Sequence, residues 1–382
     1  MSKIKILHIT NDDKFIDAAY YLYEKAFPNS NKVIVTIPDE INYILKYIKN
    51  DKYLISKKNK ESIAKIKNEI EEHDIVVFHS YDDFKAELIE KRNIKKFIYV
   101  VWGYEIYTNN FKFLYNNFEK ETLNYIEKNN SYIKKKLKPY YYIVKSFFQI
   151  LNDNKFKKLK KIKYVAILHK EDFDLFRKKN IINKNAKHCI FTYYPIEFIF
   201  KQNKDNKISG NNILIGNSAT PTNNHLDIFK KLKDLDLTGK QIILPLSYGN
   251  KEYGKYISKQ ANTIFNDVRP LFDFMPLNEY NKLLQSCNIL IMNHIRQQGV
   301  GNILAGLWLG SKVFLNKKNT FYKYLKRIGC IVFSLDELDN NNLNSLTEEQ
   351  IKINRTILSN EIGEKRIINE IINDLNQIKN NQ

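Results

Sequence analysis

Short apolar runs alternate with helix-patterned stretches along the first half of the chain. Residues 3–10 (KIKILHIT) predict a buried strand, and the apolar positions that follow it recur at helical spacing. Further apolar runs, each predicted to form a strand, lie at 32–37, 75–79 and 96–102. Strands that alternate with helices predict a mainly parallel sheet with both faces covered.

The second half of the chain repeats this alternation. Apolar runs separated by helical patterns predict strands at 212–215, 241–246, 268–272, 289–293, 312–315 and 330–334. The polar stretch 201–212 (KQNKDNKISGNN) marks a domain boundary. We therefore predict an α/β fold with two doubly wound domains, over 1–200 and 201–355, followed by a helix and polar tail over 356–382.

One segment interrupts the alternation of strands and helices in the first domain. Residues 129–164 are dense in lysine, tyrosine and phenylalanine, which predicts an insertion. Aromatic side chains at the headgroup level and lysines on anionic lipid are typical of a helix on a membrane surface. We expect this basic aromatic insertion to contact an anionic membrane surface.

Composition narrows the class of protein. A length of 382 residues fits two domains of ordinary size, and the net charge of +20 implies an anionic partner: nucleic acid, an acidic membrane or a phosphorylated substrate. Part of that charge is scattered lysine that carries no information about a partner. The three cysteines are far apart and no apolar run is long enough to span a bilayer, so we expect a soluble or peripheral protein of a reducing compartment.

Candidate chemistry follows the predicted strands of the second half. Gly216, Asn217 and Ser218 come directly after its first strand and precede a helix, where small residues let peptide N–H groups approach an anion. An ordinary capped turn explains the same residues. A stronger signal follows the strand at 289–293, where a cation, amide side chains and glycines open a helix, which is what a departing diphosphate needs; the residues are His294, Arg296, Gln297, Gln298, Gly299, Gly301 and Asn302.

Other candidates rest on weaker patterns. Ser247 and Tyr248 end a strand, and Tyr248 could stack on a nucleobase or belong to a plain turn. Trp102 and Gly103 follow an apolar strand with Glu105, which is a candidate general base for an acceptor hydroxyl or a surface carboxylate beside a core tryptophan.

Three further patterns complete the set of candidates. His8 and His79 end predicted strands, where each could touch phosphate or acceptor or serve the structure. The D-x-D patterns at 172–174 and 234–236 arise easily by chance, so we predict no metal site.

These residues resemble a known family. The runs WGYEIY, IGNSATPTNNHLDIF, PLSYGNKEYGKYI and LLQSCNILIMNHIRQQGVGNILAGLWLGSKVFLNKKNTFY are similar to the 4-acetamidofucosyl (Fuc4NAc) transferases of enterobacterial common antigen synthesis, glycosyltransferase family fifty-six. The resemblance is clearest over 102–107 and 213–322. The run R-Q-Q-G-[IV]-G, here at 296–301, is the most specific part.

The resemblance implies a GT-B hexosyltransferase, with two Rossmann-like domains facing a central cleft. It implies a dTDP-sugar donor on the C-terminal domain, an undecaprenyl diphosphate-linked saccharide on the N-terminal domain, and no metal or other cofactor. It places the enzyme peripherally on the cytoplasmic face of the bacterial inner membrane. The family's glycine-asparagine-serine turn corresponds to 216–218 and its tryptophan-glycine motif to 102–103, but the family has aspartate where this chain has Glu105.

Two other functions compete with this interpretation. A nucleic-acid-binding protein would suit the net charge and the aromatic content, but no nucleic-acid module is recognisable, so we expect no nucleic-acid partner. A nucleotide-sugar epimerase of GT-B form would use the same fold and donor. The tryptophan motif and the basic segment favour a lipid-linked acceptor over that alternative.

Overall fold

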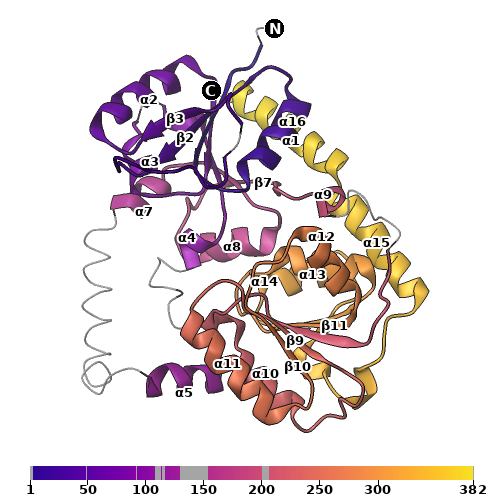
Figure 1. Ribbon diagram of the computed structural model, residues 1–382. Coiled ribbons are helices and arrows are strands. Elements are labelled where there is room, and N and C mark those ends of the chain that lie inside the picture. Colours follow the sequence, from indigo (N-terminus) through magenta and orange to yellow (C-terminus); the bar gives the residue numbers. More distant parts are fainter. Residues whose placement is uncertain are drawn as a thin grey trace. The chain divides into compact units, whose positions relative to one another are not determined.

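The computed structural model describes residues 3–48, 50–91, 93–107, 113, 117–129, 154–199 and 206–381. They form two compact units (Figure 1). The first unit comprises 1–112, 147–195 and 362–382, and the second comprises 113–146 and 196–361. Each unit has its own parallel sheet, so the prediction of two doubly wound domains is confirmed.

The first unit is built on a seven-stranded sheet in the order β3-β2-β1-β4-β5-β6-β7. Its strands are β1 (Ile6–Asn11), β2 (Asn31–Ile37), β3 (Leu54–Lys57), β4 (Ile75–His79), β5 (Phe97–Val100), β6 (Tyr164–Ala166) and β7 (Lys187–Cys189). The described pairings are all parallel, and β4 and β5 are buried along their whole length, as continuous apolar runs require. Strand order reverses between β1 and β4, which is where ligands bind in such sheets.

Helices cover this sheet. They are α1 (Ile16–Ala26), α2 (Lys60–Glu72), α3 (Asp83–Glu87), η1 (Ile94–Lys96), α4 (Tyr104–Tyr107), α7 (Asn154–Leu159), α8 (Lys170–Lys178) and α16 (Glu364–Asn380). Local signals start several of them: the side chains of Asn59 and Asp82 accept hydrogen bonds from the backbone N–H groups of Ser62 and Lys85.

The C-terminal helix departs from the predicted polar tail. α16 packs on α1, and its residues Ile367, Ile371, Leu375 and Ile378 are buried in the first unit. The prediction of a helix and polar tail over 356–382 missed this apolar stripe. Its residues recur every three to four positions, and the polar residues between them make the segment polar on average.

The second unit is built on a six-stranded sheet in the order β10-β9-β8-β11-β12-β13. Its strands are β8 (Asn212–Ile215), β9 (Ile242–Pro245), β10 (Val268–Leu271), β11 (Cys287–Met292), β12 (Lys312–Leu315) and β13 (Phe333–Ser334). Strand order reverses between β8 and β11. The loops after these two strands carry the strongest candidates of the sequence.

The helices of the second unit include one that lies early in the chain. They are α5 (Lys120–Lys128), α9 (Ile196–Ile199), η3 (Pro221–Asn223), α10 (His225–Leu232), α11 (Lys251–Ile264), α12 (Leu277–Gln285), α13 (Val300–Leu309), α14 (Thr320–Arg327), η4 (Leu335–Glu337), η5 (Asn340–Asn342) and α15 (Glu348–Ile362). α5 packs on α10, and Tyr125 stacks on Tyr256 with ring centroids 4.3 Å apart. A single boundary near residue 200 therefore does not describe the division, because α5 belongs with the second unit and α16 with the first.

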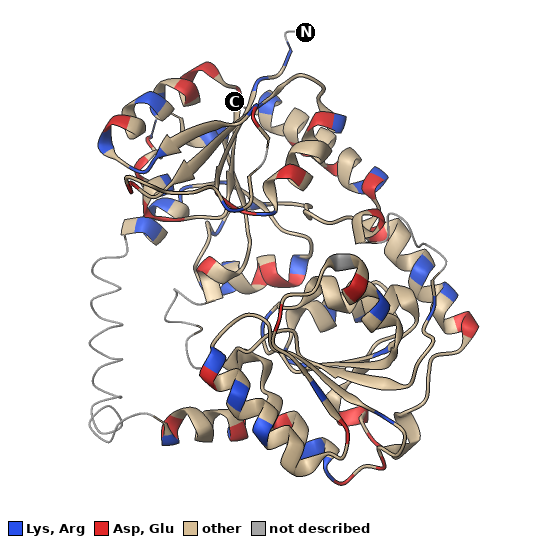
Figure 2. Cartoon of the chain, in the orientation of Figure 1, with Lys and Arg blue, Asp and Glu red and all other residues tan. Residues whose placement is uncertain are grey.

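Most of the predicted basic insertion, residues 130–153 of 129–164, lies outside the described residues. Lysine and arginine residues are spread over helices of both units (Figure 2). Among the described helices none has the length and apolar character that crossing a bilayer demands.

Candidate functional site

The loop after β8 makes one wall of the candidate site in the second unit. Gly216 has φ +72°, and a Cβ atom there would lie 2.7 Å from both Asn223 Oδ1 and His225 Nε2. Only glycine combines this left-handed backbone with so close an approach. The glycine of the predicted turn is therefore demanded by packing as well as by backbone conformation.

Asn223 joins this loop to the one after β11. Its Oδ1 accepts hydrogen bonds from Asn217 N (2.8 Å) and from His294 Nε2 (2.8 Å), and its Nδ2 donates to Ser218 Oγ (3.0 Å). His294 is consequently the tautomer protonated on Nε2. Burial, with smaller contributions from Arg296 and His225, lowers the pKa of His294 well below its ordinary value, so the ring is neutral.

Gln298 closes the same network from the other side. Its Nε2 donates to Asn217 Oδ1 (3.1 Å), and its Oε1 accepts from Thr222 Oγ1 (2.8 Å). Asn217 Nδ2 in turn donates to the hydroxyl of Tyr248 (2.6 Å), a residue that is 57% exposed. Three loops, after β8, β9 and β11, are thus fixed to one another at the carboxyl edge of the sheet.

Helix α13 begins at this point. Its N-cap is Gly299, with φ +68°, which brings no side-chain acceptor for the first backbone N–H groups, and the space around Gly301 is open. The α13 N-terminus therefore presents peptide donors and the positive end of the helix dipole to an anion. Six of the seven residues of the helix from Ile303 to Leu309 are apolar and all seven are buried, which anchors the helix behind the site.

Arg296 adds a positive charge to this helix terminus. Its charge acts on Tyr248 and on His294. It opposes the larger effect of burial, which raises the pKa of Tyr248, and it adds to the effect of burial, which lowers the pKa of His294. The buried carboxamide of Asn319 donates to the carbonyl oxygens of His294 (2.9 Å) and Arg296 (3.0 Å). The backbone that carries Arg296 is therefore held in place before any ligand arrives.

The structure brings most of the predicted donor residues together. Gly216, Asn217, Tyr248, His294, Arg296, Gln298 and Gly299 share this network, and Asn302 donates to the hydroxyl of Tyr280 (2.8 Å). Ser247 and Gln297 are half-buried beside it. Ser218 is different: it is fully buried and its hydroxyl is spent on Asn223 and Thr220, so it shapes the loop instead of facing a donor.

Sequence reasoning missed the asparagines that hold the site. Asn224 adopts the left-handed conformation (φ 51°) and donates through Nδ2 to the carbonyl oxygens of Asn293 (2.8 Å) and Asn117 (3.2 Å). Its Oδ1 accepts from Glu119 N (2.9 Å). The available signal was the pair of asparagines directly before a helix, a position that favours capping residues.

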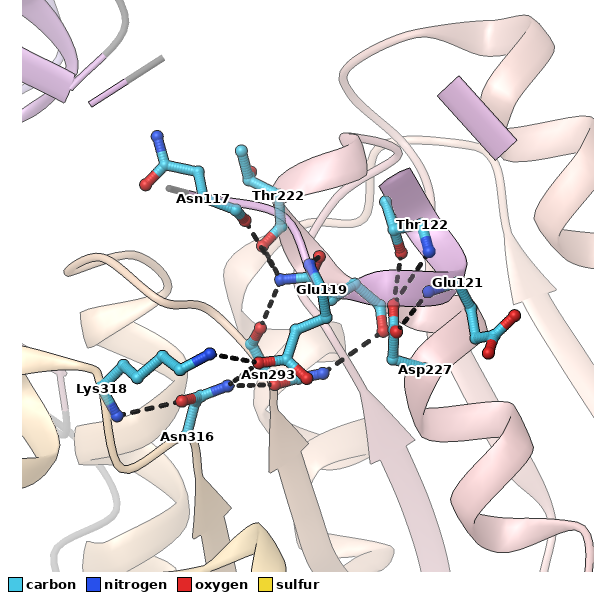
Figure 3. Close-up of polar contacts among 10 residues, drawn as sticks. Asn117, Glu119, Glu121, Thr122, Thr222, Asp227, Asn293, Asn316 and Lys318 are labelled. Atoms are coloured by element: carbon cyan, nitrogen blue, oxygen red, sulfur yellow. Dashed lines mark hydrogen bonds and ion pairs between the residues drawn. The ribbon is translucent and has the colours of Figure 1, made fainter. Parts of the chain in front are cut away.

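Figure 3 shows how α5 is tied to the same edge of the second unit. The Asp227 carboxylate of α10 accepts hydrogen bonds from Glu121 N (2.8 Å), Thr122 N (3.1 Å) and Thr122 Oγ1 (2.7 Å), so it caps α5 from a neighbouring helix. Glu119 Oε1 accepts from Asn316 Nδ2 (3.1 Å) and contacts Lys318 Nζ (3.3 Å). The loops after β8, β11 and β12 are thereby braced by a segment from the first third of the chain.

The first unit has its own polar network at its sheet. Asn31 spends its Nδ2 on Glu24 and on the carbonyl of Phe27, so its Oδ1 accepts from His8 Nε2 (3.1 Å). His8 Nδ1 then accepts from His79 Nε2 (3.0 Å).

The chain of hydrogen bonds continues to the tryptophan motif. His79 Nδ1 accepts from the Tyr193 hydroxyl (2.9 Å), which accepts from Trp102 Nε1 (2.7 Å). Burial lowers the pKa of His8 to about 4 and that of His79 well below its ordinary value, so both rings are neutral. The acceptor contact predicted for His8 and His79 is corrected here, because both rings are buried and each ring nitrogen already has a partner within the unit.

Trp102, Gly103 and Glu105 lie where β5 leads into α4. Gly103 has φ +88° and its carbonyl accepts from Ile106 N and Tyr107 N, which starts the helix. Glu105 is 9% exposed and its Oε1 accepts from the Tyr99 hydroxyl (2.6 Å) and Trp102 N (3.0 Å), whereas Oε2 has no hydrogen-bond partner among the described residues. Burial raises the pKa of this carboxyl.

A buried lysine accompanies this carboxyl. Lys85 is fully buried, its Nζ donates to Asn11 Oδ1 (3.3 Å) and lies 3.9 Å from Asp82 Oδ2, and its charge acts on Glu105. Burial lowers its pKa to about 8. Asn11 ends β1, and Lys85 and Glu105 follow β4 and β5, so the three residues surround the point where strand order reverses. Nothing in the sequence pattern marked Lys85.

The two D-x-D patterns differ in their surroundings. Asp172 is buried and accepts from the Tyr107 hydroxyl (2.6 Å), while Asp234 and Asp236 are exposed on the second unit. Among the described residues no three carboxylate, histidine or cysteine side chains are grouped as ligands of one ion.

Comparison with known proteins relates this geometry to one family. The model of the family described as 4-alpha-L-fucosyltransferase, glycosyl transferase group 56, matches residues 145–360, which is more than half of the chain. Among solved structures, a glycosyltransferase from Rickettsia africae is 14% identical, with a TM-score of 0.64 and 100% of both chains covered.

Two further structures share the fold. HepE of Anabaena, in complex with UDP-glucose, is 11% identical with a TM-score of 0.62, covering 98% of this chain and 100% of that one. Sucrose-phosphate synthase of Thermosynechococcus elongatus is 8% identical with a TM-score of 0.64, covering 99% and 100%. At these identities the likeness concerns the fold, which is GT-B as predicted.

Proposed function

The chain belongs to the 4-alpha-L-fucosyltransferase family, glycosyl transferase group 56, and from this premise we propose that it transfers a Fuc4NAc-like sugar from a dTDP donor to an undecaprenyl diphosphate-linked saccharide. Membership makes it a glycosyltransferase. The choice of donor and acceptor rests on the resemblance of residues 102–107 and 213–322. The proposed setting is the cytoplasmic face of the bacterial inner membrane, with the enzyme attached peripherally.

The α13 N-terminus with Arg296 is the observation that carries this proposal. When the bond between sugar and diphosphate breaks, negative charge grows on the leaving phosphate oxygens. Arg296 and the first N–H groups of α13 meet that charge without reorganising, because Asn319 and the network around Asn223 hold their backbone. In this proposal these groups supply the compensating charge, and no metal is required.

The roles of the other donor residues follow from their exposure. Tyr248 offers an exposed ring beside Arg296, suited to stacking on the thymine base or to lining the sugar pocket. Gln297, Gln298 and Asn302 flank the helix start and supply amide donors and acceptors for phosphate and sugar hydroxyls. The neutral, Nε2-protonated His294 leaves its buried Nδ1 as an acceptor without a hydrogen-bond partner in the described structure.

Glu105 is the proposed general base of the first unit. A carboxylate that removes the proton of an acceptor hydroxyl works best when its pKa is raised toward the operating pH, and burial raises the pKa of Glu105. Its Oε2 is buried and has no hydrogen-bond partner among the described residues, and Lys85 opposes the effect of burial and so favours the ionised form. Trp102 provides the aromatic surface for a sugar face.

A panel of nucleoside diphosphates tests the donor. A ligand that binds the native state alone stabilises it by about 2.7 kcal/mol at a concentration of a hundred times its Kd. We expect dTDP to raise the melting temperature more than UDP or GDP, and dTDP-Fuc4NAc to yield an elongated undecaprenyl diphosphate-linked product by mass spectrometry. A larger shift with UDP or GDP would replace the proposed donor, and release of a free isomerised sugar would identify an epimerase.

A further inference from the structure

The connection between β2 and β3 is an irregular segment. It runs from Pro38 to Tyr53, and its described residues, 38–48 and 50–53, contain no helix, although parallel strands are ordinarily joined through one. Irregular connections of this length in a compact domain are uncommon and are usually functional. The segment leaves β2 at the carboxyl edge of the sheet, the same edge at which Trp102 and Glu105 follow β5.

This connection is fixed to the body of the first unit. The Asp12 carboxylate, directly after β1, accepts hydrogen bonds from Lys46 N (2.6 Å), Tyr47 N (3.0 Å), Ile48 N (3.1 Å) and the Tyr43 hydroxyl (3.1 Å). Ile48 and Tyr53 are buried, and the Tyr53 hydroxyl donates to Asp17 (2.9 Å). The described part of the segment therefore has a defined conformation, although it contains no helix or strand.

Between these anchors the segment points apolar side chains into solvent. Ile41 is 93% exposed and Ile44 is 84% exposed, the two highest values among the exposed isoleucines and leucines of the described residues. Leu45 and Tyr47 are exposed beside them, and so are Leu54 and Ile55 of β3, the edge strand. We call these six residues the apolar ridge. So many exposed apolar residues within the stretch 41–55 mark an interaction surface.

A cation and an aromatic ring beside the ridge indicate the partner. The described lysines in the segment and just beyond it are accompanied by Asp39, Glu40, Asp51 and Glu61, and two of these lysines, Lys57 and Lys58, are paired with Asp39 and Asp82; the lysines are Lys46, Lys52, Lys57, Lys58 and Lys60. Lys46 Nζ lies 5.1 Å from the centre of the Tyr47 ring, so a cation and an aromatic ring stand together directly next to the isoleucines. Apolar tips with aromatic rings and lysines behind them match the layers of a bilayer surface, from acyl chains to anionic headgroups.

We propose that the apolar ridge docks the first unit on an anionic lipid surface, with Ile41 and Ile44 entering the acyl boundary and Tyr47 and Lys46 at the headgroups. The inference rests on the proposed function, in which the acceptor is carried by a membrane lipid. Two highly exposed isoleucines next to a lysine and a tyrosine ring form the combination that a lipid surface favours. Because Asp12 already orders the segment, binding costs little conformational entropy.

Sedimentation with lipid vesicles tests this surface. The wild-type chain is expected to sediment with vesicles of phosphatidylglycerol and phosphatidylcholine, and the double variant Ile41→Asp/Ile44→Asp to lose at least about tenfold in partition coefficient. The control is Phe274→Asp, which places a charge at an apolar residue of the second unit that is 87% exposed, and it is expected to sediment like the wild type. Lys46→Glu should weaken vesicle binding more at low salt than at high salt.

Three outcomes would overturn the docking surface. They are equal sedimentation of the Ile41/Ile44 variant and the wild type, no sedimentation of the wild type at all, and a wild-type dimer that the double variant converts to a monomer without any change in vesicle binding. The dTDP-induced rise in melting temperature, measured in every variant, separates this result from the proposed function. If dTDP stabilises all of them, a failure concerns the ridge alone, whereas absence of any dTDP effect concerns the donor site.

Discussion

At the scale of single residues, Gly216 gives the most direct test of the second-unit site. We expect Gly216→Ala to lower the free energy of unfolding by about 2 kcal/mol or more, because the new Cβ would meet Asn223 Oδ1 and His225 Nε2 at 2.7 Å as well as the left-handed backbone. Thermal unfolding, with dTDP binding by calorimetry, measures both stability and site geometry.

Gly239 provides the matched control for this substitution. It has the same φ of +72°, but a Cβ there would meet nothing within 4 Å. Gly239→Ala therefore reports the backbone cost alone, about 1 kcal/mol. If both variants lost the same stability, the crowding at Gly216 would have no energetic weight and the account of the β8 loop would be wrong.

Residue types could be predicted from the sequence more reliably than their partners. The glycines at 216 and 299 follow strands and precede helices, a pattern visible without coordinates. The pairing of His8 with His79 is not visible, because the residues are 71 positions apart and meet only when β1 and β4 become neighbours. An expectation of acceptor contact from strand ends alone failed for that reason.

At the scale of elements, the packing of helix α16 on the first unit changes the pKa of one of its carboxyl groups. Asp374 faces the buried Cys189 of β7, and burial raises its pKa to about 7, with a smaller effect from Glu370. In the unfolded chain this carboxyl titrates near its ordinary value of 3.8. Between about pH 4 and 7 the folded protein keeps a proton that the unfolded chain releases, so this group costs stability as pH rises through that window.

The substitution Asp374→Asn removes that titration. We expect the variant to gain stability relative to the wild type as pH rises from 4 to 7, by on the order of 3 kcal/mol, and the difference to stay level above that range. Chemical unfolding of both proteins across the pH range measures it. The control Asp234→Asn removes the same charge from an exposed position. A difference that is independent of pH would show that Asp374 is not protonated in the folded state.

Element type was more predictable than element membership. Buried runs such as IVVFH and CNILIM identify β4 and β11, since a parallel strand covered on both faces must be apolar throughout. The placement of α5 on the second unit depends on Asp227 and Tyr256, more than 100 positions later in the chain. No local pattern in residues 120–128 encodes that partner.

At the scale of the whole molecule, the two units repeat one plan with different chemistry. In each, strand order reverses between the first strand and the fourth of that sheet in chain order, and polar side chains gather at that reversal. Parallel β-α alternation made this plan predictable from sequence. In the first unit the gathered groups are Glu105, Lys85 and the neutral histidine pair, whereas in the second they are Arg296 and the α13 N-terminus. In the proposed function, Glu105 of the first set removes a proton and the second set binds the diphosphate.

This division of chemistry predicts where a nucleotide acts. Hydrogen exchange with dTDP present is expected to slow in the loops at 216–224 and 294–302 and at the start of α13, and to stay unchanged in the loop at 236–241 on the opposite edge of the same sheet.

The variant Arg296→Ala tests the same site. Its protection from hydrogen exchange by dTDP should fall, with a loss of dTDP affinity of about tenfold or more and a larger loss of transfer rate. The control Arg327→Ala removes an exposed arginine from the end of α14 and should leave both unchanged. Because Asn319 fixes the loop through backbone carbonyls, Arg296→Ala should melt at the wild-type temperature. Two results would contradict the assignment of the diphosphate to the α13 N-terminus. They are dTDP-induced protection from hydrogen exchange in the first unit only, and a normal transfer rate of Arg296→Ala.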